Sequence, residues 1–197
     1  MMRLARSIPP LALVLMLGAC FGGGKVPASL LTLSPTAPGT ADTVRTASAA
    51  QTVTIDVPVT PKSLKSVRVP AQQGATTIAY IKDLTWIDLP DRLFQQLLSE
   101  TLKRTTNKLV LDPAQSSLDP GLRVTGQLDR FGYDAATSAV IVRYDAAIAP
   151  AAGDRVETRR FEASEPAAGD AASVGPALNR AANKVAIDVA QWIGSRN

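Results

Sequence analysis

Three runs of alternating apolar and polar residues follow one another in the second half of the chain, and they limit the available folds more than any other pattern in it. They cover Leu122 to Tyr133, Ala139 to Ala149 and Arg155 to Ser164, with loops of about five residues between them. A period of two is typical of strands that bury one face, and short loops favour antiparallel neighbours. The sequence therefore predicts an antiparallel meander.

Shorter strands are predicted in the first half of the chain. The run from Thr52 to Val59 alternates, with its aliphatic side chains expected on one face, and Pro58 and Pro61 place its end at a sheet edge or outside the sheet. The loop from Pro70 to Gly74 is expected to separate two further strands. Together with one strand after the first helix, these are expected at Val67 to Val69, Thr77 to Ile81 and Lys108 to Leu111.

Two segments have the spacing of amphipathic helices. In the first, apolar residues recur at intervals of four from Leu89 to Leu102. Asp88 is the expected N-cap, Pro90 falls in the first turn, and the helix is expected to end near Thr105.

The second helix is expected at the end of the sequence, where apolar residues recur from Val174 to Trp192. Ser173 is the expected cap, Pro176 is placed within the first turn, and Gly194 is the expected stop. The predicted fold class is α+β: a mostly antiparallel sheet with two amphipathic helices packed on one face.

Residues 1–19 have the pattern of a secretory signal. Arg3 and Arg6 precede an uncharged run from Ile8 to Leu17, and small residues follow it. The run is about ten residues long, whereas a helix needs about twenty to cross a bilayer. We therefore expect this segment to be removed.

Cys20 is the expected site of lipid attachment. Leu17-Gly18-Ala19-Cys20 resembles the lipobox of bacterial lipoproteins, in which the thiol receives a diacylglyceryl group before cleavage. Several acyl chains, such as palmitate, hold a protein on a membrane far more firmly than one myristoyl chain does. The alternative is an ordinary signal peptidase site beside an incidental thiol. Phe21 stands where lipoproteins kept in the inner membrane usually have Asp, so this resemblance implies the outer membrane.

Residues 20–50 are predicted to form a tether, because they are rich in Gly, Pro, Ser, Thr and Ala. Leu30, Leu31 and Leu33 form an apolar island in it that allows one short strand. A mature chain of about 180 residues suits a single core, and we place this one folded domain at residues 51–197.

Composition argues against several classes of function. The chain has no histidine and one cysteine, which excludes Ser-His-Asp and Cys-His catalysis, His-ligated zinc and an intrachain disulfide. No metal and no cofactor are expected. Asp129, Asp134 and Asp145 occur singly, and solvated surface charges are a better interpretation than a glycosidase-like pair. Without residues 1–19 the side-chain charge is +2, from 19 basic and 17 acidic residues, and no basic patch predicts nucleic-acid binding.

A series of short motifs then identifies a family resemblance. In chain order they are Leu30-Leu31-Thr32-Leu33, Ile55-Asp56-Val57, Ile78-Ala79-Tyr80, Trp86-Ile87-Asp88-Leu89-Pro90, Leu122-Arg123-Val124 through Phe131, and Trp192-Ile193. In this order they resemble the ABC-type transport auxiliary lipoproteins, the family of the paraquat-inducible protein C-like lipoprotein partners of MCE lipid transport systems. Two features differ: Leu30-Leu31 stand where the family often has a tyrosine pair, and no clear arginine directly precedes Trp86.

The resemblance implies a non-enzymatic auxiliary component of an MCE/ABC-type lipid transport system, facing the periplasm from the outer membrane. Its implied partners are an MCE-domain protein and the permease and ATPase of an ABC transporter, and a homo-oligomer stays open. An outer-membrane assembly or pilot lipoprotein and a periplasmic lipid-binding module are the alternatives. Trp86, Leu89 and Pro90 are the candidate partner contact, although packing of Trp86 against helix and sheet is the favoured interpretation.

Overall fold

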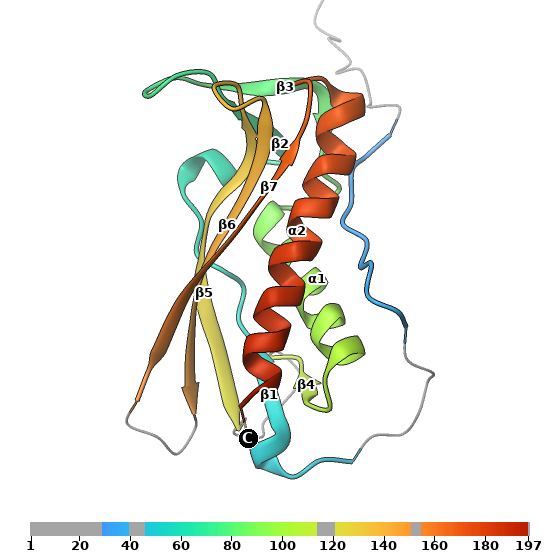
Figure 1. Cartoon of the computed structure of the whole chain (residues 1–197), viewed down its shortest axis with the longest axis vertical. Coiled ribbons are helices and arrows are strands. Elements are labelled where there is room, and N and C mark those ends of the chain that lie inside the picture. Colours follow the sequence, from blue (N-terminus) through green and yellow to red (C-terminus); the bar gives the residue numbers. More distant parts are fainter. Residues whose placement is uncertain (1–28, 40–45, 114–120, 151–154, 197) are drawn as a thin grey trace, which may run out of the picture.

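The computed structural model describes residues 29–39, 46–113, 121–150 and 155–196 (Figure 1). This part of the chain forms one sheet of seven strands, two long helices and two single-turn 3-10 helices. In chain order the elements are η2 (Ala49–Gln51), β1 (Thr52–Ile55), η3 (Lys62–Leu64), β2 (Arg68–Gln72), β3 (Ile78–Thr85), α1 (Pro90–Thr105), β4 (Leu109–Leu111), β5 (Leu122–Asp134), β6 (Ala139–Pro150), β7 (Glu157–Pro166) and α2 (Ala171–Gly194).

The predicted meander is confirmed. Strands β5, β6 and β7 pair antiparallel in sequence order, with Leu128 opposite Tyr144 and Tyr144 opposite Phe161. The third strand begins at Glu157 and ends at Pro166, two residues later at each end than predicted. Strand β7 lies beside α2 (Figure 1), and the ring of Phe161 in β7 lies 5.5 Å from that of Trp192 in α2.

The rest of the sheet depends on the length of β5. One edge of β5 pairs with β6 along its length, and the other pairs with β1 near its start and with β2 at its end, both parallel. Strand β4 extends the sheet beside β1, and β3 pairs antiparallel with β2. The fold is therefore α+β with a mostly antiparallel sheet, as predicted, although the parallel pairs were not foreseen.

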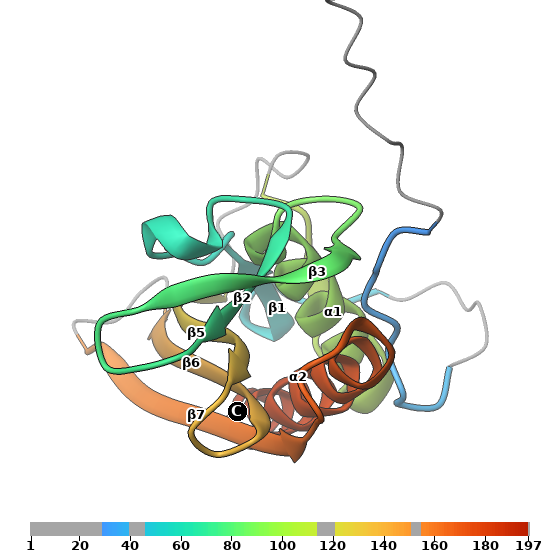
Figure 2. The same ribbon diagram turned by 90° about the horizontal axis from the view of Figure 1, so that it is seen from above.

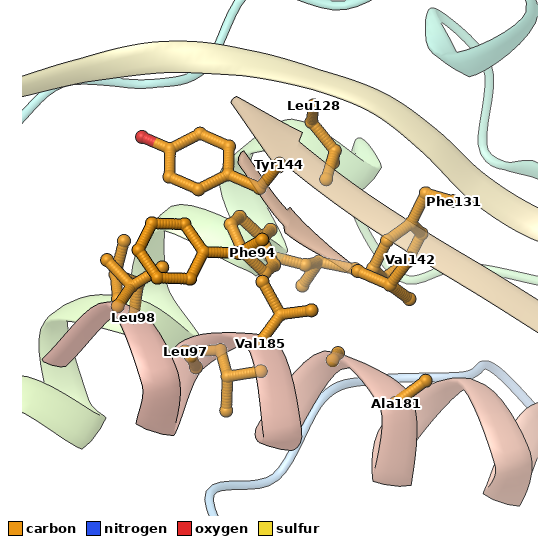
Figure 3. Packing of buried hydrophobic residues seen from close by; sticks show 14 of the residues in the cluster. Phe94, Leu97, Leu98, Leu128, Phe131, Val142, Tyr144, Ala181 and Val185 are labelled. Carbon is orange, nitrogen blue, oxygen red and sulfur yellow. The ribbon is translucent and has the colours of Figure 1, made fainter. Parts of the chain in front are cut away.

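Both helices pack on one face of the sheet, and an aromatic group joins the layers (Figure 3). The ring of Phe94 in α1 lies 5.1 Å from that of Tyr144 in β6 and 6.3 Å from that of Phe131 in β5. The Trp86 ring lies 5.4 Å from Phe131, and all four side chains are buried. The apolar stripes predicted for α1 and α2 are the faces that fill this core.

Two helix starts differ from the prediction. The N-cap of α1 is Leu89, not Asp88, whose carboxylate instead accepts a hydrogen bond from the Leu89 amide at 2.7 Å. Helix α2 begins at Ala171 with Asp170 as its cap, because the Asp170 carboxylate accepts from the Ser173 amide at 2.8 Å. Pro176 therefore lies beyond the first turn. The predicted ends near Thr105 and Gly194 are confirmed.

The short strands were predicted less well. Strand β1 stops at Ile55, and Val57 and Val59 are 49% and 68% exposed rather than buried with Val53. The stretch from Pro70 to Gln72, predicted as loop, belongs to β2. The register between β2 and β3 shifts between Arg68 and Pro70. Proline has no backbone N–H to donate, and it is tolerated at such an irregularity.

Residues 29–39, which we expected within the tether, pack along the domain, and we call this segment the strap. Leu31 forms a parallel bridge with Trp86, and both Leu31 and Leu33 contact the core. Further along, the side chain of Asn183 in α2 accepts from the Thr36 amide at 2.7 Å and donates to the Ser34 carbonyl at 2.9 Å. The strap thus follows α2 from its N-terminal part to its middle.

Candidate functional site

The expected lipidation site, Cys20, lies outside the residues that the structure describes. The described chain starts nearby, at Ser29, where the strap reaches the start of α2 and the end of β3. Lipid attachment therefore stays a prediction, and the structure shows only where on the domain the described chain begins, nine residues after Cys20.

The candidate partner residues lie where the strap meets β3 and α1. Trp86 is 1% exposed, and its indole N–H has no hydrogen-bond partner among the described residues. Pro90 is buried in the first turn of α1, and Leu89 is half-buried. Ile87, which sequence reasoning did not single out, is 61% exposed between them. Trp86 thus packs in the core, and Ile87 is the side chain that reaches solvent.

Backbone hydrogen bonds bring three segments together around Trp86. The Leu31 amide donates to the Thr85 carbonyl at 2.8 Å, and the Ile87 amide donates back to the Leu31 carbonyl at 2.9 Å. On the other side, the Trp86 amide donates to the Val67 carbonyl at 2.7 Å. Large apolar side chains next to these bonds, at Leu30, Val67 and Ile87, are exposed. This end of the domain therefore gathers apolar surface from distant parts of the sequence.

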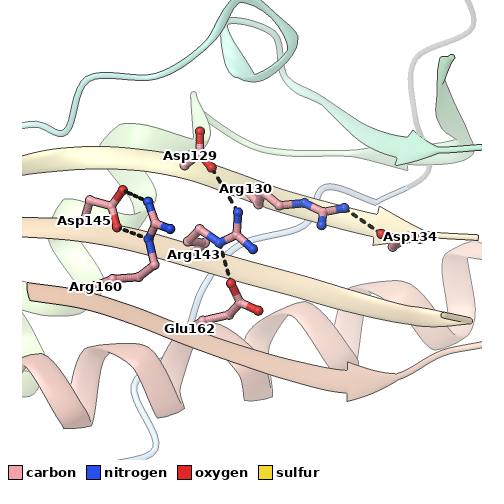
Figure 4. A network of polar contacts seen from close by, with 7 residues as sticks. All are labelled: Asp129, Arg130, Asp134, Arg143, Asp145, Arg160 and Glu162. Carbon is pink, nitrogen blue, oxygen red and sulfur yellow. Dashed lines mark hydrogen bonds and ion pairs between the residues drawn. The ribbon is translucent and has the colours of Figure 1, made fainter. Parts of the chain in front are cut away.

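The outer face of the meander carries a network of ion pairs (Figure 4). Arg160 donates two hydrogen bonds to Asp145, at 2.6 and 2.7 Å, across β6 and β7. Arg143 lies between Asp129 at 3.4 Å and Glu162, and Arg130 donates to Asp134 at 2.7 Å. The carboxylates expected to be solvated are partly exposed, but each is paired with an arginine.

These pairs determine what the carboxylates can do. The Arg160 guanidinium holds the pKa of Asp145 below its usual value, and Arg130 does the same for Asp134. A general acid of the glycosidase kind needs a raised pKa, so neither residue suits that role. Among the described residues no group of three or more potential ligands could hold a metal ion.

A surface hollow of about 690 Å³ opens where α1 and α2 end. Its lining is mainly polar or small: Ala50, Gln51, Thr105, Thr106, Asn107, Lys108, Ala190, Gln191, Gly194 and Arg196. Sites for apolar ligands are lined mostly by hydrophobic and aromatic side chains, so this hollow does not have the character of an acyl-chain pocket.

Sequence reasoning also missed Asn183, which fastens the strap. It is 2% exposed in the apolar row of α2, between Ala182 and Val185. A polar residue in such a row was the available signal, because a buried amide must find hydrogen-bond partners. No helix in the described part of the chain has the length and hydropathy of a membrane span.

Comparisons with known proteins agree with this fold. A crystal structure of protein XCC0632 from Xanthomonas campestris, of the family DUF330, superposes with a TM-score of 0.65 at 16% identity, covering 85% of this chain and 92% of that one. A second crystal structure, of an uncharacterized protein, gives 0.62 at 12% identity over 84% and 99%. No curated protein matches the chain.

The family comparison covers most of the sequence. The family model described as "ABC-type transport auxiliary lipoprotein component" matches residues 31–190. This range begins inside the strap, at the residue that bridges to Trp86, and ends within α2. The chain therefore belongs to the ABC-type transport auxiliary lipoprotein components.

Proposed function

We propose that this protein is a non-enzymatic accessory subunit of an MCE-type lipid transport system. Lipid on Cys20 holds it on the outer membrane, with the domain in the periplasm. The observation that carries the proposal is the family match over residues 31–190, because it includes every strand, the whole of α1 and all but the last four residues of α2. Family membership associates the chain with an ABC transport system and a membrane anchor, and the MCE partner and outer membrane are our extension.

The described surface supports a role in assembly rather than chemistry. The chain has no histidine. Asp134, Asp145 and Glu165 are engaged by arginine or lysine side chains that lower their pKa values, so they favour the ionised state at neutral pH. A sheet whose surface charges are paired suits a subunit that binds other proteins.

Recovery of partners tests the proposal. Tagged wild-type protein and Cys20→Ala are purified from membranes in a mild detergent, and co-purifying proteins are identified by mass spectrometry. The wild type is expected to retain an MCE-domain protein or the transporter permease, and Cys20→Ala to retain much less because it is not held at the membrane. Repeated recovery of neither partner by the wild type contradicts the proposal.

The partner contact at Trp86, Leu89 and Pro90 is tested separately at Leu89. Trp86 and Pro90 are buried, so replacing either disturbs the core as well as a contact. Leu89 is the half-buried N-cap of α1, and Asp is a favoured N-cap, so Leu89→Asp removes the apolar contact while supporting the helix. Loss of the partner with an unchanged Tm supports this contact, and full retention excludes Leu89 from it.

A further inference from the structure

An exposed apolar surface lies at the end of the domain where the strap begins, and Figure 2 looks onto this end. Five large side chains form it, and we call them the β3 surface: Leu30 at 49% exposed, Val67 at 38%, Ile78 at 48%, Tyr80 at 36% and Ile87 at 61%. The other large apolar side chains exposed in the described chain are Val57, Val59 and Val156. Exposed apolar side chains that gather at one end of a domain are typical of a contact surface.

Basic side chains accompany the β3 surface. Lys62, Lys65, Arg68 and Lys82 are exposed, and residues 62–82 contain no Asp or Glu. None of the four forms an ion pair with a described residue. The Arg68 guanidinium lies 4.4 Å from the centroid of the Tyr80 ring. Aromatic, aliphatic and cationic groups side by side match the interface of a bilayer, where Tyr lies at headgroup level and Lys and Arg reach phosphates.

The strap places this surface close to the proposed anchor. Nine residue steps separate Cys20 from Ser29, which limits their distance to about 32 Å even when fully extended. The bridge between Leu31 and Trp86 fixes where the strap leaves the domain, and the C-terminus lies at the opposite end (Figure 1). Acyl chains on Cys20 would therefore hold this end nearest the membrane.

We propose that the β3 surface rests on the bilayer that receives the acyl chains of Cys20. Ile87, Leu30 and Val67 enter the headgroup layer, and Arg68 and Lys82 bind the phosphates of anionic phospholipids. The domain then has one fixed orientation, with its C-terminal end away from the membrane. This inference rests on the lipid anchor of the proposed function.

Fluorescent labels in the mature, lipidated protein test the contact. Cys20 is the one cysteine and is acylated in this form, so an introduced cysteine reacts selectively. Ile87→Cys and Ile78→Cys carry an environment-sensitive NBD label, and Thr158→Cys, exposed on β7, is the matched control. In vesicles of phosphatidylethanolamine and phosphatidylglycerol, NBD emission is expected to shift to the blue at positions 87 and 78 but not at 158.

Charge is tested in the same vesicles. Lys65→Glu combined with Lys82→Glu alters exposed side chains, and the blue shift at position 87 is expected to shrink. Omitting phosphatidylglycerol is expected to reduce the shift in the wild-type background and to have little further effect in the charge variant. If neither the two substitutions nor the omission of phosphatidylglycerol changes the blue shift, the proposed contact with lipid headgroups is wrong.

The remaining outcomes separate the surface from the anchor. Protein that fails to float with vesicles contradicts the anchor, and the orientation with it. Protein that floats without any shift at positions 87 and 78 contradicts the β3 surface alone. A shift that appears in detergent without vesicles and grows with protein concentration assigns the surface to a second copy of the chain, and that result also overturns the membrane contact.

Discussion

Tyr144 connects α1 to the meander, because its ring lies 5.1 Å from that of Phe94. Its side chain is fully buried, yet its hydroxyl donates to the Thr125 carbonyl at 3.1 Å. Burial, and to a smaller extent the negative charge of Asp56, raises the pKa of the phenol, which stays protonated. The ring finds space because position 126, on the neighbouring strand, has no side chain. A polar tip with a partner and an apolar ring in the core explain why a tyrosine fits here.

Gly126→Ala is expected to destabilise the protein by about 1–3 kcal/mol, because the added methyl overlaps the Tyr144 ring, with its nearest ring atoms at 2.6 Å, and the Asp145 carbonyl. Urea denaturation measures the change. The matched control is Gly74→Ala in the loop before β3, where a Cβ meets nothing within 4 Å, and its change is expected to stay within about 0.5 kcal/mol. Equal stability of the two variants would show that the ring does not need this space.

Predictions for single residues were correct where hydrophobicity alone decides whether a side chain is buried. Phe94, Leu97 and Trp192 belong to the apolar stripes that spacing predicted for the two helices, and all three are buried. Asn183 was missed because its hydrogen-bond partners lie almost 150 positions earlier, in a segment that composition assigns to a tether. Spacing within one helix carries no information about such a partner.

The strap is the element whose docking the sequence did not predict, and it depends on a few polar contacts. Asn183 bonds to the Thr36 amide, the Thr36 hydroxyl and the Ser34 carbonyl, and Asn179 accepts from the Ser34 amide at 2.9 Å. Since Leu31 and Leu33 are only partly buried, these bonds supply much of the specificity for this path.

Asn183→Ala is expected to cost about 2 kcal/mol, because it removes the three hydrogen bonds that join this buried amide to the strap. Hydrogen exchange should reveal a selective loss of protection at the Thr36 amide. Asn179→Ala removes one exposed bond and serves as the graded comparison, with an expected cost of about 1 kcal/mol or less. Unchanged exchange at Thr36 in Asn183→Ala would contradict this role.

Glu165 on β7 connects the edge of the sheet to α2 through two ion pairs. It accepts from Arg180 at 3.0 Å and also pairs with Lys184, and these two bonds lower its pKa. A carboxyl with a lowered pKa in the folded state adds stability above its unfolded pKa, about 4.3, and loses it as pH falls through the folded value.

Glu165→Gln is therefore expected to destabilise the protein at neutral pH and to match the wild type in strong acid. The cost at pH 7 is expected to be about 1 kcal/mol or less, because Arg180 and Lys184 are 52% and 61% exposed and water screens the pair. Thermal unfolding from pH 7 to pH 3 measures the gap, which should close below about pH 4.3. Asp188→Asn, on the exposed part of α2, is the control. A gap independent of pH would assign the effect to packing.

The length of a strand decided whether the sequence predicted it correctly. Strands β5, β6 and β7 have ten or more residues each, so their alternation identified them and their short loops gave the antiparallel order. Strands β1, β2 and β4 have three to five residues. Their parallel partners come from distant parts of the chain, and so few residues do not specify direction or register.

At the scale of the whole molecule, the domain has two distinct ends and one charged face. The strap and the β3 surface mark one end, and the C-terminus marks the other (Figure 1). The ion pairs of Figure 4 cover the side of the meander that faces away from the helices. Composition and the lipobox predicted an anchored domain without familiar catalytic groups, but the arrangement of these surfaces depends on tertiary packing that periodicity does not encode.

The proposed lipid anchor at Cys20 would determine how this arrangement meets a membrane, and its chemistry can be measured directly. Cells that express wild-type protein or Cys20→Ala are labelled with radioactive palmitate, and the purified proteins are analysed by gel and by intact mass. The wild type should carry label and have the mass of a chain that begins at an acylated Cys20, whereas Cys20→Ala should carry none. A wild-type protein that is unlabelled, or that keeps residues 1–19, would contradict the anchored role.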